Sequence, residues 1–363
     1  MNPQNQNNLT QPRPSYKIFN KWEVVTNGWY EALDSKKLGP GKALGVDVAG
    51  QHLVLFRGES GKVYALDGFC PHMGVDLGIG KVIGEEIRCF FHHWKFDGKG
   101  QCREIPCLSE KKLEVKTATY KVQEKYGRIW VYPKSEAPYD VLEVPELEGQ
   151  KVSYSFGKSY KRRCHFHVTM INGIDPQHLS TVHNINMNMD VSIDYSEKDT
   201  IDINLEGETP NSRFSEKLVK KLLGDRYAYS MKYQGGCLAA LSVMKGVKLF
   251  NKWEILPTLH MLFAYQSHRE GETIVQPIFL TKKRNFLIDR ILLLFTKLAF
   301  KMLQGEDGEV YENIRFNTQN LLPIDAPVTK YIKYINGLTP SLWSRQIPTE
   351  PKPSIRKKRE VRV

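Results

Sequence analysis

The sequence predicts an α+β protein built from two domains, a small all-β domain followed by a larger domain that mixes strands with helices. Its 363 residues are about twice the ~150 residues of an ordinary domain. Short β-type runs separated by glycine-containing turns fill the first part of the chain, and longer strand-like and helix-like segments alternate in the second. Hydrophobic residues make up 41% and charged residues 25%. These values are close to the globular average, so they argue against a disordered, collagen-like or coiled-coil chain.

The first domain is expected over residues 19–135, after an Asn/Gln/Pro-rich stretch, 1–18, that we expect to be disordered. Runs rich in β-branched and aromatic residues alternate here with turn residues such as Asp97-Gly98-Lys99-Gly100. The clearest runs are Leu53–Phe56, Lys62–Leu66 and Arg128–Tyr132. No segment has the length and pattern of a good helix, which is why an all-β domain is predicted.

The second domain is expected over residues 145–347, after a proline-containing linker, and a basic tail is expected over 348–363. Strands are predicted at Tyr160–Ile171, Leu238–Val247 and Leu259–Gln266, and helices near 172–184 and 286–304.

The charge of the chain is strongly basic, with 52 Lys and Arg against 40 Asp and Glu, or +12. Such an excess is compatible with nucleic acid, an anionic membrane or an acidic protein partner. Residues 351–363 carry six basic residues and one Glu (+5), and residues 281–303 carry six and one Asp (+5), which leaves +2 elsewhere. The excess is therefore local, and no nucleic-acid-reading motif accompanies it. No nucleic-acid partner is expected, whereas contact with a membrane surface or an acidic electron donor stays open.

The start of the sequence has no apolar segment or cleavage site of a secretory signal, and no stretch reaches ~18 uncharged apolar residues. The six cysteines are spread along the chain, which favours thiols or metal ligands over a disulfide framework. We therefore expect a cytoplasmic protein, with peripheral membrane contact as an open alternative.

Two Cys-His pairs stand in the first domain, Cys70-x-His72 and Cys89-x-x-His92. A zinc finger would place two thiols on one loop and two imidazoles on the other. Here each loop supplies one ligand of each kind, which suits a [2Fe–2S] cluster whose irons are held by two thiolates and by two imidazoles. The spacing predicts that Cys70, His72, Cys89 and His92 bind such a cluster.

The segments Cys70–Gly74 and Cys89–Pro106, followed by Gly127-Arg128-Ile129-Trp130, resemble the Rieske domain of Rieske non-haem iron oxygenases. Two departures are visible. Met73 stands where Arg is common, and Phe90 and His93 stand where the familiar sequence is Cys-Pro-Tyr-His-Gly-Trp. The resemblance implies an oxygenase (alpha) subunit with a C-terminal helix-grip domain, an antiparallel sheet with helices, that holds a mononuclear Fe(II) for O₂ activation.

Candidate ligands for that iron are His178 and His183 together with a distant carboxylate, the 2-His-1-carboxylate set of non-haem Fe(II) enzymes. On a regular helix the two histidines would lie about 140° apart, so the helix must bulge or bend between them. The resemblance assigns the third position to Asp307, with Glu306, Glu309 and Asp325 as rivals. A solvated acidic helix start is the alternative for that segment.

The resemblance gives Asp175 and Asn172 roles at the iron site. In that family the assembly is a head-to-tail homotrimer, in which His92 would bond Asp175 of the adjacent subunit and Asp175 would also bond His178. A ferredoxin or reductase would supply electrons from NAD(P)H. Asp175-Pro176 also fits a plain helix N-cap, and Asn172 could serve only as a hydrogen-bonding residue.

The substrate is less defined. Thirteen of the eighteen residues in Phe286–Leu303 are apolar. The segment fits either a packed helix with a basic outer stripe, or a membrane contact or apolar entrance. Local features resemble the ketosteroid hydroxylase and sterol desaturase branch, which implies hydroxylation or desaturation of a bulky hydrophobic small molecule. An O- or N-demethylating monooxygenase for a small polar substrate and a non-catalytic Rieske electron carrier are the alternatives.

Overall fold

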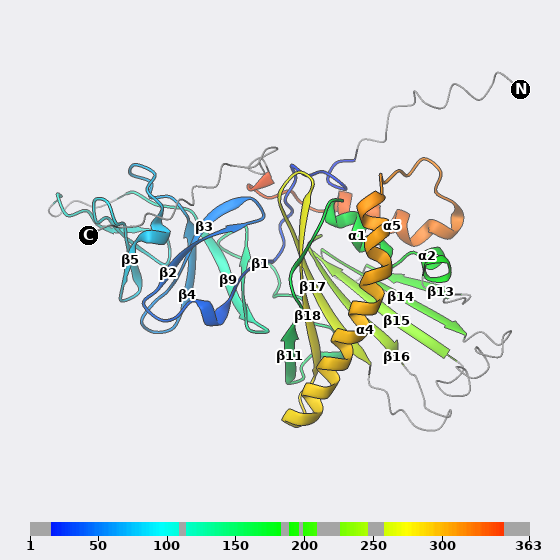
Figure 1. Ribbon diagram of the computed structural model, residues 1–363. Helices are drawn as coiled ribbons and strands as arrows, with labels where there is room; N and C mark the ends of the chain where they lie inside the picture. The colour runs from blue at the N-terminus through cyan, green and yellow to red at the C-terminus, as the bar shows by residue number, and fades with distance from the viewer. Residues whose placement is uncertain are drawn as a thin grey trace, which may run out of the picture.

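The computed structural model describes residues 16–108, 114–182, 189–195, 199–208, 226–245 and 258–344. Within these ranges the chain forms three antiparallel sheets, two in the first domain and one in the second (Figure 1). The predicted α+β fold, with its all-β first domain, is confirmed.

The first domain pairs a six-stranded sheet with a small four-stranded sheet. The larger sheet has the order β1-β10-β9-β4-β3-β2. Its strands are β1 (Tyr30–Asp34), β2 (Ala43–Val48), β3 (Gln51–Arg57), β4 (Val63–Asp67), β9 (Thr119–Lys125) and β10 (Arg128–Tyr132). The small sheet runs β5 (Lys81–Ile83), β6 (Glu86–Arg88), β7 (Lys95–Asp97) and β8 (Cys102–Glu104). Ile87 and Phe96 of the small sheet pack against Phe56 of β3, which joins the two sheets in one apolar core.

The second domain is built on an eight-stranded sheet with the order β11-β18-β17-β16-β15-β14-β13, and β12 pairs with β18. Its strands are β11 (Val152–Phe156), β12 (Tyr160–Arg162), β13 (Met189–Asp194), β14 (Thr200–Glu208), β15 (Arg226–Gln234), β16 (Leu238–Lys245), β17 (Leu259–Arg269) and β18 (Glu272–Lys282). The helices are α1 (Phe166–Asn172), α2 (Pro176–Thr181), α4 (Phe286–Asn313) and α5 (Ala326–Gly337). Helix α4 crosses β17 and β18 (Figure 1).

Successive residues along the strands of this sheet pack alternately into two different hydrophobic cores, one on each face. On β17, Met261 and Phe263 pack in the core shared with the helices. Leu262 and Ala264 point the other way and pack with residues of the first domain, such as Trp130. Side chains of a strand alternate between its faces, so the sheet has one face for the helices and one for the neighbouring domain. The two domains are therefore joined by a continuous apolar core.

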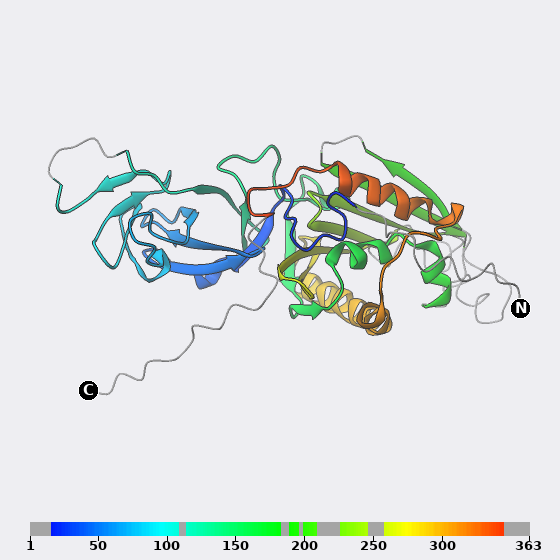
Figure 2. The ribbon, with the colours of Figure 1, turned by 90° about the horizontal axis from the view of Figure 1, so that it is seen from above.

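The segment that follows α5 also joins the domains. The amide of Ser341 donates to the carbonyl of Val25 at 2.7 Å. Trp343 is 1% exposed and packs against Tyr30 and Tyr120 of the first domain. In the other direction, Ile18 and Phe19 pack in the core of the second domain (Figure 2).

Two predicted elements differ from the structure. Tyr160–Ile171 was expected to be one strand, but only Tyr160–Arg162 is extended and Phe166–Asn172 is helical. The predicted helix 172–184 is the short helix α2, which ends at Thr181. In the parts of the chain that the structure describes, no helix is both long enough and apolar enough to cross a bilayer.

Candidate functional site

The first candidate site lies on two loops beside the small sheet. Cys70 follows β4, and Cys89 lies between β6 and β7. The amide of Cys70 donates to the carbonyl of Val75 at 2.8 Å, and the amide of Gly74 donates back to the carbonyl of Cys70 at 2.9 Å. Gly74 adopts φ +75°, a left-handed conformation that glycine allows at no steric cost. The amide of Cys89 donates to the carbonyl of Trp94 at 2.8 Å. Each loop is thus a tight, hydrogen-bonded turn.

The four predicted cluster residues differ in solvent exposure according to their type. The cysteines are buried, with Cys70 4% and Cys89 2% exposed, whereas His72 and His92 are exposed. The two imidazole rings lie 4.7 Å apart, and His72 stacks on Trp94 at 4.4 Å. Burial, together with the neighbouring Cys89, raises the pKa of the Cys70 thiol to about 11. Thiols of this kind ionise readily only beside a strong positive charge, such as a bound metal.

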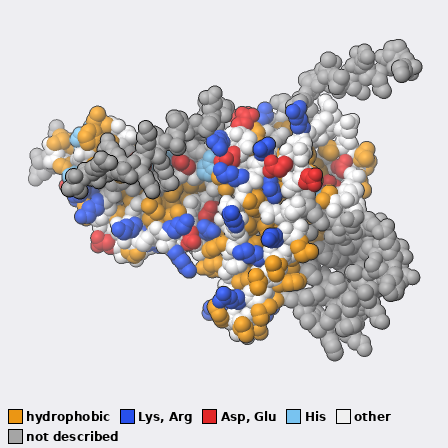
Figure 3. Space-filling view, viewed as in Figure 1, with side chains coloured by type: hydrophobic (Ala, Val, Ile, Leu, Met, Phe, Trp, Pro, Cys, Tyr) orange, Lys and Arg blue, Asp and Glu red, His pale blue; other side chains and the backbone are white. Residues whose placement is uncertain are grey.

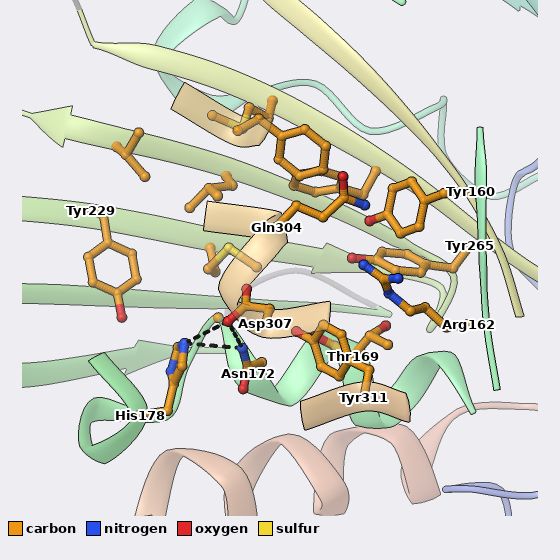
Figure 4. Close-up of a pocket in the computed structure, with 17 residues that line it drawn as sticks. Tyr160, Arg162, Thr169, Asn172, His178, Tyr229, Tyr265, Gln304, Asp307 and Tyr311 are labelled. Carbon is orange, nitrogen blue, oxygen red and sulfur yellow. Dashed lines mark hydrogen bonds and ion pairs between the residues drawn. The ribbon is translucent and has the colours of Figure 1, made fainter. Parts of the chain in front are cut away.

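The second candidate site joins helices α1, α2 and α4. The Asn172 amide donates to Oδ1 of Asp307 at 2.9 Å and lies 3.0 Å from Nε2 of His178. Nε2 of His178 lies 3.6 Å from Oδ1 of Asp307. Figure 4 shows the three side chains converging at one side of a pocket. Asp307, 135 positions from Asn172 in the sequence, therefore meets the neighbouring pair Asn172 and His178, and the sequence analysis singled out all three residues.

Electrostatics and hydrogen bonding fix the His178 ring. Its Nδ1 lies 3.0 Å from the carbonyl oxygen of Asp175. Burial acts to lower the pKa of His178, but the Asp307 carboxylate and the Asp175 carbonyl outweigh it, and the pKa is raised above its ordinary value. The contact with the carbonyl leaves Nε2 as the ring nitrogen that faces Asn172 and Asp307.

Asp175 caps helix α2. Its Oδ1 accepts from the backbone amides of Gln177 and His178, and Pro176 occupies the first helical position. The structure thus contains the N-cap that the sequence offered as the alternative interpretation. The expected contact of Asp175 with the His178 ring is made by the carbonyl, not by the carboxylate.

The bulge or bend predicted between the two histidines stays a prediction, because α2 ends at Thr181 and the second histidine is not among the described residues. His183 lies outside the described residues, as does the basic tail expected over 348–363. Among the described residues, no group of three or more His, Cys, Asp or Glu side chains is arranged to hold a single ion.

Helix α4 supplies the carboxylate. It was expected to end near residue 304 but continues to Asn313, so Asp307 lies inside a helix and not at an acidic helix start. Phe300, Gln304, Asp307 and Tyr311 recur at helical spacing and all line the pocket. Of the rival carboxylates, Asp325 bonds Gln177 and the amide of Leu322, and Glu309 is exposed. The side chain of Glu306 lies outside the described part.

The pocket has an empty volume of about 920 Å³, which includes its open mouth. Most of its wall is apolar. The apolar part is formed by Met231, Leu241, Val243, Met261, Phe263 and Phe300. Polar groups enter at Arg162, Thr169 and Gln304 and at the hydroxyls of Tyr160, Tyr265 and Tyr311. A mostly apolar cavity with a few polar groups is typical of a small-molecule site.

Sequence reasoning missed these polar lining residues. Arg162 stands in the basic run Lys161-Arg162-Arg163, within the segment that was expected to be a strand. The spacing of Asp307 and Tyr311 could have indicated that Tyr311 lines the same site as Asp307, because residues four apart share a helix face.

A sequence profile described as the Rieske [2Fe-2S] domain matches residues 28–123. This range contains all four residues of the first site. Residues 28–123 are a Rieske domain.

Curated relatives match less than half of the chain. The cholesterol 7-desaturase of Ciona intestinalis is 33% identical over 164 residues, which are 44% of this chain and 35% of that protein. The oxygenase component of 3-ketosteroid-9-alpha-monooxygenase from Rhodococcus rhodochrous is 31% identical over 162 residues, 43% of each protein. The matches thus span less than half of the length of these curated relatives.

Solved structures extend the likeness to the second domain. Dicamba monooxygenase bound to 3,6-dichlorosalicylic acid aligns with a TM-score of 0.60 and 19% identity, over 86% of this chain and 98% of that one. The terminal oxygenase of carbazole 1,9a-dioxygenase from Nocardioides aromaticivorans aligns with a TM-score of 0.63 and 14% identity, over 90% and 97%. The fold of the chain is therefore similar to that of these two oxygenases over 86–90% of its length.

A Rieske domain holds a [2Fe–2S] cluster. The residues present fit it, because two buried thiols adjoin each other and two exposed imidazoles adjoin each other, one type for each iron. The departures of this Rieske domain from the familiar sequence lie on its surface. Met73 is 65% and Phe90 68% exposed, and His93 adopts φ +62°, where the familiar sequence has glycine.

The Rieske cluster loops and helix α2 lie at opposite ends of the molecule. Figures 1 and 2 place the small sheet at one extreme of the first domain, and α2 lies on the far side of the second domain. One chain by itself therefore does not bring the two candidate sites together.

Proposed function

We propose that the chain is the oxygenase component of a Rieske-type monooxygenase or dioxygenase. A [2Fe–2S] cluster on Cys70, His72, Cys89 and His92 would receive electrons, and a mononuclear Fe(II) would be held by His178, His183 and Asp307. The observation that carries this is the meeting of Asn172, His178 and Asp307 at an apolar pocket, in a chain with a Rieske domain. When bound, such an iron leaves coordination positions open for O₂ beside the substrate.

The chain's own residues prepare this site. The Asp175 carbonyl holds the His178 ring with Nε2 toward the pocket, and the Asn172 amide holds the Asp307 carboxylate. Hydrogen bonds of this kind orient metal ligands and exclude competing rotamers. Asp175 and Asn172 are therefore proposed as residues that tune the iron site, with Asp175 also on the electron path.

The proposed reaction is hydroxylation or desaturation of a bulky hydrophobic substrate. The apolar pocket wall supports this, as do the names of the relatives, a cholesterol desaturase and a ketosteroid monooxygenase. In Figure 4 the apolar side chains lie on the strands that face the His178 and Asp307 side of the pocket.

The proposed partners are a ferredoxin or reductase that delivers electrons from NAD(P)H, and two further copies of the chain in a head-to-tail homotrimer. The positions of the two sites at opposite ends of one chain support transfer between subunits (Figure 1). In that trimer His92 would donate to Asp175 of the adjacent subunit. A cytoplasmic location belongs to the same proposal.

We also propose that the first half of α4 contacts an anionic membrane surface. Its outer face exposes large apolar side chains, namely Phe286, Leu287, Ile291, Leu294, Leu298 and Met302. Exposed basic side chains flank them, namely Lys283, Arg284, Arg290, Lys297 and Lys301. Figure 3 shows apolar and basic side chains gathered in the lower part of the molecule, where α4 begins. An apolar face with a basic border is complementary to an anionic bilayer.

Iron content tests the proposed function. Anaerobically reconstituted protein should hold about three irons per chain, two in the cluster and one mononuclear. Asp307→Ala should hold about two with an unchanged cluster spectrum, and Cys70→Ser should lose the cluster. With a reductase and ¹⁸O₂, the intact protein should form a labelled or dehydrogenated product from small-molecule extracts. Two irons in the intact protein would instead identify an electron carrier.

A further inference from the structure

Among the described residues that line the pocket, one charged side chain is not used by the proposed chemistry, that of Arg162 in β12. Its guanidinium lies 4.8 Å from the ring centre of Tyr160 and 5.5 Å from that of Tyr311. Figure 4 shows it entering the pocket between these aromatic side chains, on the side opposite to His178. The two tyrosines hold the guanidinium in place through cation–π contacts.

Arg162 lacks the carboxylate partners that its neighbours have. Lys161 pairs with Glu272 at 2.8 Å and Arg163 pairs with Glu312 at 3.4 Å, and both of these cations are exposed. Within the described residues, no ion pair or hydrogen-bond acceptor meets the Arg162 guanidinium, and its Nε is buried without a partner. The side chain is partly buried and its buried Nε has no acceptor, so a ligand entering the pocket could supply one.

The surroundings leave the guanidinium available. Gly308 of α4 faces it, and a Cβ there would lie 3.6 Å from Nη2, so no side chain of this residue covers the guanidinium. The acidic lining residue, Asp307, is engaged with Asn172 and His178 at the opposite side. The remaining wall between these two sides is largely apolar.

We propose that Arg162 is the anchoring subsite for a carboxylate on the substrate. The inference rests on the proposed function and narrows its substrate class to hydrophobic carboxylic acids, in place of neutral sterols. A guanidinium binds a carboxylate through two parallel N–H···O bonds, which fixes the orientation of the ligand as well as its position. The apolar body would then fill the pocket, and the carbon nearest His178 and Asp307 would be the one presented for oxidation.

Equilibrium binding tests this without turnover. Titration calorimetry on the holoenzyme, without reductant, would use three apolar acids of increasing size and their methyl esters: benzoic, 1-naphthoic and lithocholic acid. At least one acid should bind about tenfold or more tightly than its ester, since an ester cannot form the charged pair. Arg162→Met should bind that acid and its ester equally, and Arg162→Lys should retain part of the preference. Arg163→Met is the matched control and should behave as the unaltered protein.

The outcomes separate this inference from the proposed function. The proposal is overturned if no acid is preferred to its ester, or if Arg162→Met and Arg162→Lys both keep the full preference. Asp307→Ala should lose the mononuclear iron and still prefer the acid. A clear acid preference without any oxidised product would contradict the proposed oxygenase alone. Oxidation of a neutral substrate that Arg162→Met leaves unchanged would contradict the carboxylate subsite alone.

Discussion

Asp175 shows at the residue scale how one side chain can serve folding and chemistry together. Its Oδ1 caps helix α2, and its backbone carbonyl orients the ring of His178. Asparagine caps helices as well as aspartate does, whereas alanine does not. The two roles can therefore be separated by substitution.

Asp175→Asn should keep both iron centres and the stability of the protein, but lower product formation by about 10–100-fold, because the proposed link between subunits loses its charge. Asp175→Ala should in addition lower the free energy of unfolding by about 0.5–2 kcal/mol. Iron content, denaturant unfolding and turnover would be measured on both variants. Full turnover in Asp175→Asn would leave Asp175 a helix cap and nothing more.

His93 occupies a left-handed backbone conformation, φ +62°, beside a cluster residue. Such a conformation costs a non-glycine residue about 1–2 kcal/mol, and glycine avoids that cost while gaining freedom in the unfolded chain. His93→Gly should therefore stabilise the domain by up to about 1 kcal/mol with an unchanged cluster spectrum. His93→Ala is the control and should bring no gain. Denaturant unfolding followed at the cluster absorption measures both, and a loss of stability in His93→Gly would show that the imidazole makes compensating contacts.

The residues whose chemistry depends on spacing could be predicted from the sequence. The two Cys-His pairs have few alternative uses, and the Rieske profile covers them. Arg162 could not be predicted, because three basic residues in a row give no sign of which one turns inward. That choice is made by the pairing of β12 with β18 and by the tyrosines that receive the side chain.

At the scale of elements, the errors occurred where local preference and packing disagree. Phe166–Asn172 is rich in aromatic and β-branched residues, which favour strands, yet it is helix α1. Burial explains this, since Phe166, Met170 and Ile171 all pack in the core of the second domain. Helix α4 continues past residue 304 to Asn313 although Gly305 and Gly308, which are poor helix formers, lie within it.

The exposed face of α4 gives a prediction for this element. The protein should sediment with phosphatidylcholine vesicles that contain phosphatidylserine, and much less with phosphatidylcholine alone or at high salt. Ile291→Glu with Leu294→Glu should abolish the binding, since both side chains are more than half exposed and lie on the apolar face. Leu342→Glu, an exposed position outside α4, should have no effect.

The oligomeric state of the same variants tests whether the exposed face of α4 binds a second copy of the chain instead of a membrane. If light scattering shows that Ile291→Glu with Leu294→Glu dissociates the protein into monomers, this face is an interface between copies of the chain. The membrane proposal would then be wrong.

At the scale of the whole molecule, the separation of the two sites makes a stoichiometric prediction. Coexpression of Cys70→Ser and Asp307→Ala chains should give mixed trimers in which an intact cluster sometimes faces an intact iron site. For random mixing this occurs at about a quarter of the interfaces, so about a quarter of the normal turnover should return. Each variant alone should be inactive. No recovery in the mixture would contradict transfer between subunits.

The two-sided eight-stranded sheet has a consequence for how this protein could change in evolution. Positions 241, 243, 261 and 263 line the pocket, whereas positions 240, 262 and 264 pack against the neighbouring domain. Substitutions at the first set would reshape the cavity while the seam between domains stays intact. Substrate selectivity could therefore change through substitutions at every second residue of β16 and β17. The residues between them would stay unchanged and keep the contact with the first domain.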